Sequence, residues 1–187
     1  MEQYLKTFTE VLRSDGFIER DSFYEISKRW IHSILYTTRS DEVISLFSDT
    51  TEMRNAHEAL FNSEKMLRNI FDNVQVGVEL YDKEGCLVDI NTKNLDIFGI
   101  AAKEDVLGIN FFENPIVPEE IRRNVRNGQE QSFRLDYPFD RLGGYYPSRK
   151  KGSVQIYTKV TMLYDMYGEL DNFLVLNIDN TEINEAY

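Results

Sequence analysis

The longest regular pattern of apolar positions in the chain runs from Glu52 to Val74. This stretch has no glycine or proline, and its apolar or small residues recur at alternating intervals of three and four. Such spacing places side chains on one side of an α-helix, so we predict a connecting helix over residues 53–74. The positions concerned are Met53, Ala56, Leu60, Ser63, Leu67, Ile70 and Val74.

The apolar stripe on this helix allows two interpretations. The spacing continues for about three heptads, which is typical of a parallel coiled coil between two chains. Phe61, Met66 and Phe71 widen the face beyond a strict seam, as in an amphipathic helix packed on its own domain. Ala56 and Ser63 would weaken a coiled coil, which suits a helix that shifts in register. The sequence leaves both interpretations open.

A period of two replaces the helical spacing after residue 75. Residues 76–81 and 86–90 alternate apolar and other side chains, which predicts two β-strands. The segment between them ends in glycine and predicts the turn of a hairpin. In the second strand we expect Cys86, Val88 and Ile90 to share one face.

Short helices and then longer strands are expected in the rest of the chain. Asn91 is a favourable N-cap for a first helix, and a later one begins after Pro118. Three strands follow, at residues 133–139, 154–163 and 173–178. Pro138 cannot donate a ladder hydrogen bond, so the first strand should lie at an edge of the sheet. The last strand is apolar on both faces, which predicts a central position.

The end of the last strand has a counterpart earlier in the chain. The sequences EVISLFSDTTEMRNAH and NFLVLNIDNTEINEAY both place D-x-T-E after an apolar strand. The second copy is preceded by a complete set of elements and the first by only part of one. We therefore predict the C-terminal half of a first domain at residues 1–52, the helix at 53–74 and a complete domain at 75–187. We expect the chain to be part of a longer protein.

Composition and charge exclude several classes of function. Lysine and arginine number 21 against 32 aspartates and glutamates, so the net charge is −11. Such an acidic surface disfavours nucleic acids and anionic membranes. One cysteine excludes an internal disulfide, and no Cys/His set has metal-binding spacing, so no metal is expected. No apolar stretch approaches the roughly 20 residues of a membrane span, and the first residues lack the pattern of a secretory signal. We expect a cytoplasmic protein, whose parent chain can still be membrane-anchored.

The order of elements and several motifs resemble the PAS sensor domain. The motifs are residues 73–85 with Asn91 following, and the terminal run at 179–182. The join SDTTEMRNAHEALFNSEKMLRNIFDNVQVGVELYDKEG resembles the junction between tandem PAS domains in bacterial sensor histidine kinases. The resemblance implies an α+β fold with a five-stranded antiparallel sheet in the order 2-1-5-4-3 and short helices on one face. It covers residues 71–182 as a whole domain and 1–52 as a half.

The resemblance also implies a mechanical role for both D-x-T-E motifs. In this family the aspartate and threonine form hydrogen bonds at the end of the last strand and fix the angle of the outgoing helix. Glutamate then lies near the first helical turn. The residues assigned to signal relay are Asp49, Thr51, Glu52, Asp179, Thr181 and Glu182.

The resemblance narrows the choice of cofactor. Flavin photosensors of this family need a cysteine where Gly108-Ile109-Asn110-Phe111 has phenylalanine, which argues against a covalent flavin. Haem needs an axial ligand, and the complete domain has no histidine, which argues against haem. The cofactor is otherwise left unknown. Residues that would border a cavity, or simply form the core, are Phe98, Phe111, Phe112, Ile121, Val125, Tyr137, Tyr157 and Asn177.

These features predict a signalling module more than an enzyme. No nucleophile with a base, paired carboxylates or phosphate loop is visible, so the chain itself is not expected to catalyse a reaction. We expect a cytoplasmic sensory module of a bacterial two-component sensor that passes a conformational change through the inter-domain helix. A homodimer through residues 53–74 and the N-terminal half-domain is expected, with a small-molecule ligand as a further partner. The alternative is a PAS scaffold that senses nothing and serves dimerisation or protein–protein interaction.

Overall fold

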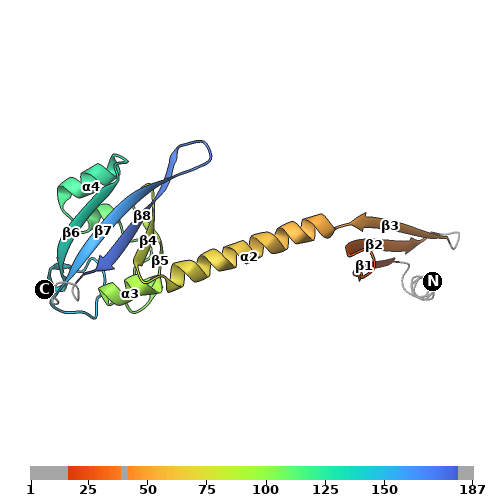
Figure 1. Ribbon diagram of the computed structural model, residues 1–187, viewed down its shortest axis with the longest axis horizontal. Coiled ribbons are helices and arrows are strands. Elements are labelled where there is room, and N and C mark those ends of the chain that lie inside the picture. Colours follow the sequence, from red (N-terminus) through yellow and green to blue (C-terminus); the bar gives the residue numbers. More distant parts are fainter. Residues whose placement is uncertain (1–16, 39–41, 181–187) are drawn as a thin grey trace. The chain divides into compact units, whose positions relative to one another are not determined.

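The chain divides into two compact units within one long helix. The computed structural model describes residues 17–38 and 42–180 (Figure 1). The units comprise residues 1–66 and 67–187, so the division falls inside the stretch for which the sequence predicts a connecting helix.

The first unit contains a three-stranded antiparallel sheet in the order β1-β2-β3. Its strands are β1 (Phe17–Tyr24), β2 (Arg29–Thr37) and β3 (Val43–Asp49). Among the described residues of this unit, only Ser33 and Leu35 are buried. No described strand pairs with the outer edge of β3. This sheet therefore has little core of its own in the described part of the chain.

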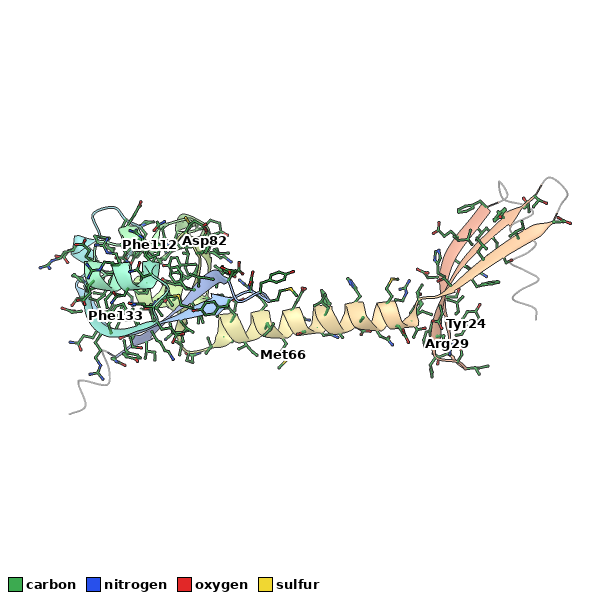
Figure 2. The ribbon with its side chains drawn as sticks, turned by 90° about the horizontal axis from the view of Figure 1, so that it is seen from above. Tyr24, Arg29, Met66, Asp82, Phe112 and Phe133 are labelled. Carbon is green, nitrogen blue, oxygen red and sulfur yellow. The ribbon has the colours of Figure 1, made fainter. Side chains whose placement is uncertain are left out.

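Helix α2 (Thr51–Asn73) corresponds to the helix that the sequence predicts over 53–74. None of its residues is buried. The apolar side chains of the predicted stripe are largely accessible, with Leu60 58% and Leu67 65% exposed. Figure 2 shows Met66 extending away from the helix. Within the described residues, the apolar stripe is thus left uncovered.

The second unit is a five-stranded antiparallel sheet in the order β5-β4-β8-β7-β6. Its strands are β4 (Gly77–Asp82), β5 (Leu87–Ile90), β6 (Gln131–Pro138), β7 (Ser153–Tyr164) and β8 (Leu170–Asp179). Numbered within the unit, this is the order 2-1-5-4-3 that the PAS resemblance implies. The edge position of β6, which contains Pro138, and the central position of β8 confirm both sequence predictions.

Short helical segments lie between β5 and β7. They are α3 (Thr92–Phe98), α4 (Glu119–Arg126) and three 3₁₀ turns at Lys103–Asp105, Phe111–Glu113 and Phe139–Arg141. Asn91 caps α3 by accepting a hydrogen bond from the Asn94 amide, and Gly99 ends the helix with a positive φ of 66°. The predicted N-cap is therefore confirmed.

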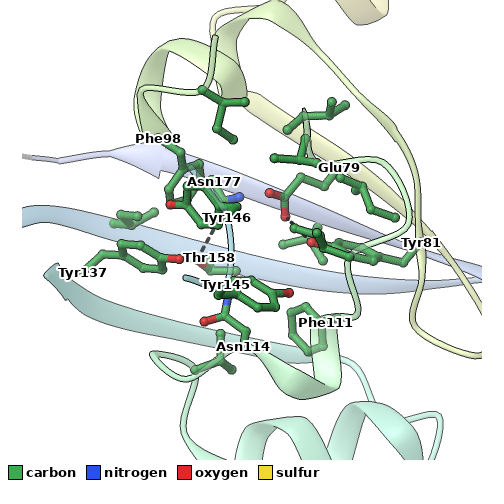
Figure 3. Close-up of a pocket in the computed structure, with 18 of the residues that line it drawn as sticks. Glu79, Tyr81, Phe98, Phe111, Asn114, Tyr137, Tyr145, Tyr146, Thr158 and Asn177 are labelled. Carbon is green, nitrogen blue, oxygen red and sulfur yellow. Dashed lines mark hydrogen bonds between the residues drawn. The ribbon is translucent and has the colours of Figure 1, made fainter. Parts of the chain in front are cut away.

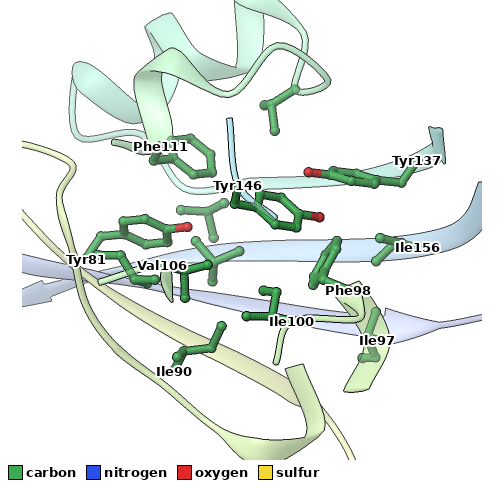
Figure 4. Packing of buried hydrophobic residues seen from close by; sticks show 14 of the residues in the cluster. Tyr81, Ile90, Ile97, Phe98, Ile100, Val106, Phe111, Tyr137, Tyr146 and Ile156 are labelled. Carbon is green, nitrogen blue, oxygen red and sulfur yellow. The ribbon is translucent and has the colours of Figure 1, made fainter. Parts of the chain in front are cut away.

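The core of this unit joins the helical segments to one face of the sheet. Alternate residues of β7 and β8 point into it, including Val160 and Phe173. Phe173 stacks on Tyr81 with ring centroids 5.1 Å apart, and Phe111 meets both rings edge-on. Figure 4 shows part of this cluster.

The alternation that the sequence predicts for β5 is wrong at Val88. Leu80 pairs with Asp89 and Tyr81 pairs with Leu87, so Val88 is an extra residue without a partner, a β-bulge. The bulge lets Leu87 and Ile90 both face the core, whereas Val88 is 48% exposed.

Candidate functional site

A cavity lies in the second unit between the helical segments and the inner face of the sheet. All five strands of this sheet contribute to its wall, as do the connections on either side of β6. Figure 3 shows polar groups gathered there among aromatic rings. The polar residues that line it are Glu79, Tyr81, Asn114, Tyr137, Tyr145, Tyr146, Thr158 and Asn177.

The cavity is small, and its wall carries an acidic group but no basic one. The centre of a water-sized sphere can occupy about 40 Å³ of it. One buried water needs roughly 10–15 Å³ by this measure, so the space holds about three waters or a ligand of similar size. Among the described residues the wall carries one carboxyl group, that of Glu79, and no lysine, arginine or histidine. Recognition here therefore depends on one acid, hydroxyls, amides and aromatic rings.

Glu79 brings an acid to the inner face of the sheet. Its Oε1 accepts a hydrogen bond from Asn94 Nδ2 at 2.7 Å, and its Oε2 accepts one from the Tyr81 hydroxyl at 3.1 Å. Glu79 keeps some accessible surface where it lines the cavity, but the surrounding protein excludes most water. This burial raises the pKa of Glu79 to about 7, although hydrogen bonds from neighbouring amides and a hydroxyl oppose the shift. Glu79 therefore changes charge near neutral pH.

Tyr146 presents a buried hydroxyl whose hydrogen bonding is incomplete, with the Tyr137 hydroxyl as its neighbour. The residue is 7% exposed, and its Oη forms no hydrogen bond of normal geometry with any described residue. Figure 4 shows the Tyr137 hydroxyl nearby. Burial raises the pKa of Tyr146 well above its usual value, so the hydroxyl stays protonated. An unpaired buried hydroxyl costs free energy unless water or a ligand satisfies it.

A chain of buried side chains connects the cavity to α3. Thr158 Oγ1 donates to Asn177 Oδ1 at 2.8 Å, and Asn177 Nδ2 donates to Asn94 Oδ1 at 3.0 Å. Asn94 in turn donates to Glu79. Asn94 has no exposed surface and Asn177 is 3% exposed. Both ends of the Asn94 amide are therefore committed within the protein.

Asn91 extends this network to the end of α2. Its Oδ1 accepts from the backbone amides of Val78 and Asn94, at 2.9 and 3.0 Å. Its Nδ2 donates to the carbonyl oxygens of Phe71 and Val76, both at 2.9 Å. Asn91 is fully buried. One side chain thus joins the last turn of α2, strand β4 and the first turn of α3.

The cavity includes half of the residues that the sequence predicts for it. Those on its wall are Phe98, Phe111, Tyr137 and Asn177. Three others belong to the surrounding core: Phe112, Ile121 and Val125. The prediction for Tyr157 is wrong, because Ile156 and Thr158 on either side of it line the cavity and neighbouring strand residues point to opposite faces.

Glu79 and Tyr146 line the cavity but were not predicted from the sequence. Val78 and Leu80 form an apolar alternation along β4, which draws attention to the face opposite Glu79. The available signal for Tyr146 was a pair of tyrosines in a loop rich in glycine. Large aromatic side chains gain free energy when they are buried, which favours packing of such a loop onto a core.

The first D-x-T-E motif forms a joint between β3, β2 and α2. Asp49 Oδ1 accepts from the Thr51 amide at 3.0 Å, and Asp49 Oδ2 accepts from Arg29 Nη1 at 2.9 Å. Thr51 Oγ1 accepts from the Trp30 amide at 2.9 Å. Hydrogen bonds from Thr51, supported by the positive charge of Arg29, hold the pKa of Asp49 below its usual value. Glu52 lies in the first turn of α2.

The second D-x-T-E motif is described only in part. Asp179 is the last residue of β8 and lies opposite Ile156 on β7. The following Asn180 amide donates to the Gln155 carbonyl oxygen at 2.8 Å. Thr181 and Glu182, to which the sequence analysis assigns a relay role, lie outside the described residues.

Within residues 17–38 and 42–180, no group of three or more His, Cys, Asp or Glu side chains could hold a metal ion. In the same ranges, every helix is too short or too polar to pass through a bilayer.

Comparisons with known proteins place this fold in a family. The family model described as PAS fold matches residues 65–179. The PAS domain of an HTR-like protein from Haloarcula marismortui is similar at 18% identity and a TM-score of 0.52, with 67% of this chain and 98% of that chain covered. The PAS domain of BvgS from Bordetella pertussis matches at 23% identity and a TM-score of 0.48, with coverages of 69% and 93%. The comparison with curated proteins finds no match. Since the family model matches more than half of its residues, the chain belongs to the PAS family.

Proposed function

We propose that this chain is a cytoplasmic sensory and relay module of a bacterial signalling protein, of the sensor histidine kinase class, without catalytic activity of its own. The observation that carries the proposal is the buried path from the cavity to α2. It passes from Glu79 through Asn94 and Asn91 to the Phe71 carbonyl oxygen.

This path can transmit a structural change because the side-chain amides of Asn94 and Asn91 are already engaged in hydrogen bonds at both ends. Asn94 uses its amide nitrogen on Glu79 and its oxygen on Asn177, and Asn91 uses both ends on backbone groups. Loss of a hydrogen-bond partner by a buried polar group costs about 1–3 kcal/mol. When one side chain of the path moves, its hydrogen-bonded neighbour is therefore expected to move with it. A change in the charge or occupancy at Glu79 would thus favour a shift at the last turn of α2.

Two further features support assembly of this module as a homodimer. The apolar stripe of α2 is exposed, and the first unit buries few of its described residues. Apolar surface of this kind usually marks an interface. The histidine kinase class itself rests on the resemblance of residues 48–85 to a tandem PAS junction. A phosphoacceptor helix and an ATP-binding domain encoded in the parent gene would support it.

The alternative is a scaffold that dimerises through α2 but senses nothing at the cavity. In that case the cavity would be a packing defect filled by water, and its chemistry would not influence the helix.

The relay is tested by amide hydrogen exchange in the Glu79→Gln variant. Glutamine keeps the shape of the side chain and removes its charge above the pKa of Glu79. We expect altered exchange of the Val74 amide, which donates to the Ile70 carbonyl oxygen in the last turn of α2. Glu169→Gln, an exposed change in the turn between β7 and β8, is the matched control and should leave Val74 unchanged.

The set of amides whose hydrogen exchange changes distinguishes a relay from a general loss of stability. A relay changes Val74 at a pH of about 8 while the amides in the middle of β7 and β8 keep their protection. Unchanged exchange at Val74, or an equal change throughout the second unit, would favour the scaffold.

A further inference from the structure

We propose that the cavity binds a small organic ammonium ion of about three non-hydrogen atoms, with its charge against Glu79 and its alkyl part against the tyrosine and phenylalanine rings. This inference rests on the proposed sensory function, since the ion would be the stimulus that reaches α2.

The charge of the wall selects a cation. Glu79 is the only acid and no basic side chain lines the cavity among the described residues, so an anion would meet repulsion without compensation. A buried carboxylate is stabilised when a cation pairs with it and otherwise tends to take up a proton. The net charge of −11 also raises the local concentration of cations around the protein.

The aromatic rings of the wall suit an alkylated cation better than a hydrated metal ion. Phe98 contacts Tyr137 and Tyr146 edge-on, with ring centroids at 5.0 and 6.3 Å, and Tyr81 contacts Phe111 at 5.5 Å. Ring faces attract ammonium groups through their quadrupole, and the attraction grows when water is excluded. The same rings provide apolar contact for an alkyl group.

The Tyr146 hydroxyl, whose hydrogen bonding within the protein is incomplete, supplies an independent indication of a missing occupant. Its oxygen can accept a hydrogen bond from an ammonium N–H group, because the Tyr146 hydroxyl interacts with the Tyr137 hydroxyl but forms no hydrogen bond of normal geometry with any described residue. An apolar molecule of the same size would leave this hydroxyl unsatisfied.

The dimensions limit the ligand. Space for about three water molecules admits methylammonium or ethylammonium and excludes large amines in this conformation. Small ligands gain at most about 1.5 kcal/mol per non-hydrogen atom, so we expect a Kd on the order of 1 mM for ethylammonium.

Binding should depend on pH because the ion needs the carboxylate form of Glu79. Protons and the cation then compete for the same group. Among the described residues, the titratable side chains that face Glu79 are Tyr81, Tyr137, Tyr145 and Tyr146, which stay neutral in this range because burial raises the pKa of each. Affinity should fall about tenfold per pH unit below the pKa of Glu79 and level off above it.

The test is an NMR titration of the full chain with ethylammonium chloride. Ethanol, sodium acetate and sodium chloride are the matched neutral, anionic and salt controls. We expect saturable shifts at Glu79 and Tyr146 with ethylammonium alone. Glu79→Gln should weaken binding at least tenfold and Tyr146→Phe a few-fold, whereas Glu169→Gln should have no effect.

Each outcome decides one of the two proposals. Equal shifts with ethanol or sodium chloride, or unchanged binding to Glu79→Gln, would overturn the ammonium site. If that happens while Glu79→Gln still alters exchange at Val74, the relay survives without this ligand. Saturable binding of ethylammonium that leaves Val74 exchange unchanged would support the site and overturn the relay.

Discussion

At the scale of single residues, Glu79 needs different hydrogen bonds in its two protonation states. The carboxylate accepts from Asn94 and from Tyr81. The protonated form must donate from one oxygen, and the Tyr81 hydroxyl can accept by rotating, whereas the Asn94 amide nitrogen cannot. Protonation therefore reverses the hydrogen bond with Tyr81 and weakens the one from Asn94, because a neutral carboxyl oxygen is a weaker acceptor than a carboxylate oxygen.

The raised pKa of Glu79 makes the stability of the second unit depend on pH. The native protein binds this proton more tightly than the unfolded chain between the usual pKa of 4.5 and the native value of about 7. The stabilisation is complete below pH 4.5 and is lost as the pH rises to 7, by a total on the order of 3 kcal/mol. Residue 79 of the Glu79→Gln variant cannot titrate. The free energy of unfolding of the variant, relative to that of the wild type, should therefore increase as the pH rises through this window and remain constant above it.

Urea denaturation at pH 5, 6, 7 and 8, followed by exchange of β8 amides, measures this difference. The only tryptophan, Trp30, lies in the first unit and therefore cannot report on the second. Glu169→Gln serves as the control, and its free energy of unfolding should differ from that of the wild type by the same amount at every pH. A constant difference for Glu79→Gln as well would show that Glu79 titrates normally.

Single residues were the least predictable part of the site. Position 77 in β4 requires a glycine, because a Cβ there would come within 2.3 Å of Asn94 Oδ1. The two residues are 17 positions apart in the sequence, so no local pattern shows this contact. Glu79 shares that inner face of β4, but no local pattern marks a buried acid. Periodicity shows which residues share a face of a strand, but it does not show which face is buried under the helical segments.

At the scale of elements, the strand ends determine how α2 begins. Asp49 and Thr51 bridge to Arg29 and Trp30 on β2, so the first turn of the helix is tied to two strands at once. The Arg54 guanidinium lies 4.6 Å from the centre of the Trp30 ring and adds a contact from the helix.

We predict that Asp49→Ala loosens this joint more than it disturbs any core. The change removes acceptors for the Thr51 amide and for Arg29, so exchange of the Thr51 and Trp30 amides should become faster. Because Trp30 lies at the joint, quenching of its fluorescence by acrylamide should increase. Amides of β7 and β8 should not respond.

Two further variants identify the cause. Ser48→Ala changes the exposed neighbour of Asp49 and should have no effect, and Asp49→Asn keeps an acceptor oxygen and should have an intermediate one. A loss of melting temperature as large as that of Leu135→Ala, which alters the core of the second unit, would argue against a role confined to the joint.

Most elements could be predicted from sequence because their signals are local. The absence of glycine and proline predicts α2, and Pro138 predicts an edge strand, since both effects act on the backbone of the residue itself. The bulge at Val88 could not be predicted, because it depends on the register between β5 and β4.

At the scale of the whole molecule, the two units differ in how far they bury their own apolar residues. The core cluster lies entirely in the second unit, whereas the first buries only Ser33 and Leu35 among its described residues. A small sheet with so little buried surface is marginal alone, so association with another chain would stabilise it.

We therefore predict that the chain is a dimer in solution whose association depends on the apolar stripe of α2. The double change Leu60→Glu and Leu67→Glu places charges in the stripe and should shift the molecular mass in sedimentation equilibrium from that of a dimer towards 22.0 kDa. The double change Asn62→Glu and Asn69→Glu adds the same charges to exposed positions on the other side of the helix and should leave the dimer intact. A wild-type monomer, or equal dissociation of both variants, would show that the stripe is not the dimer interface.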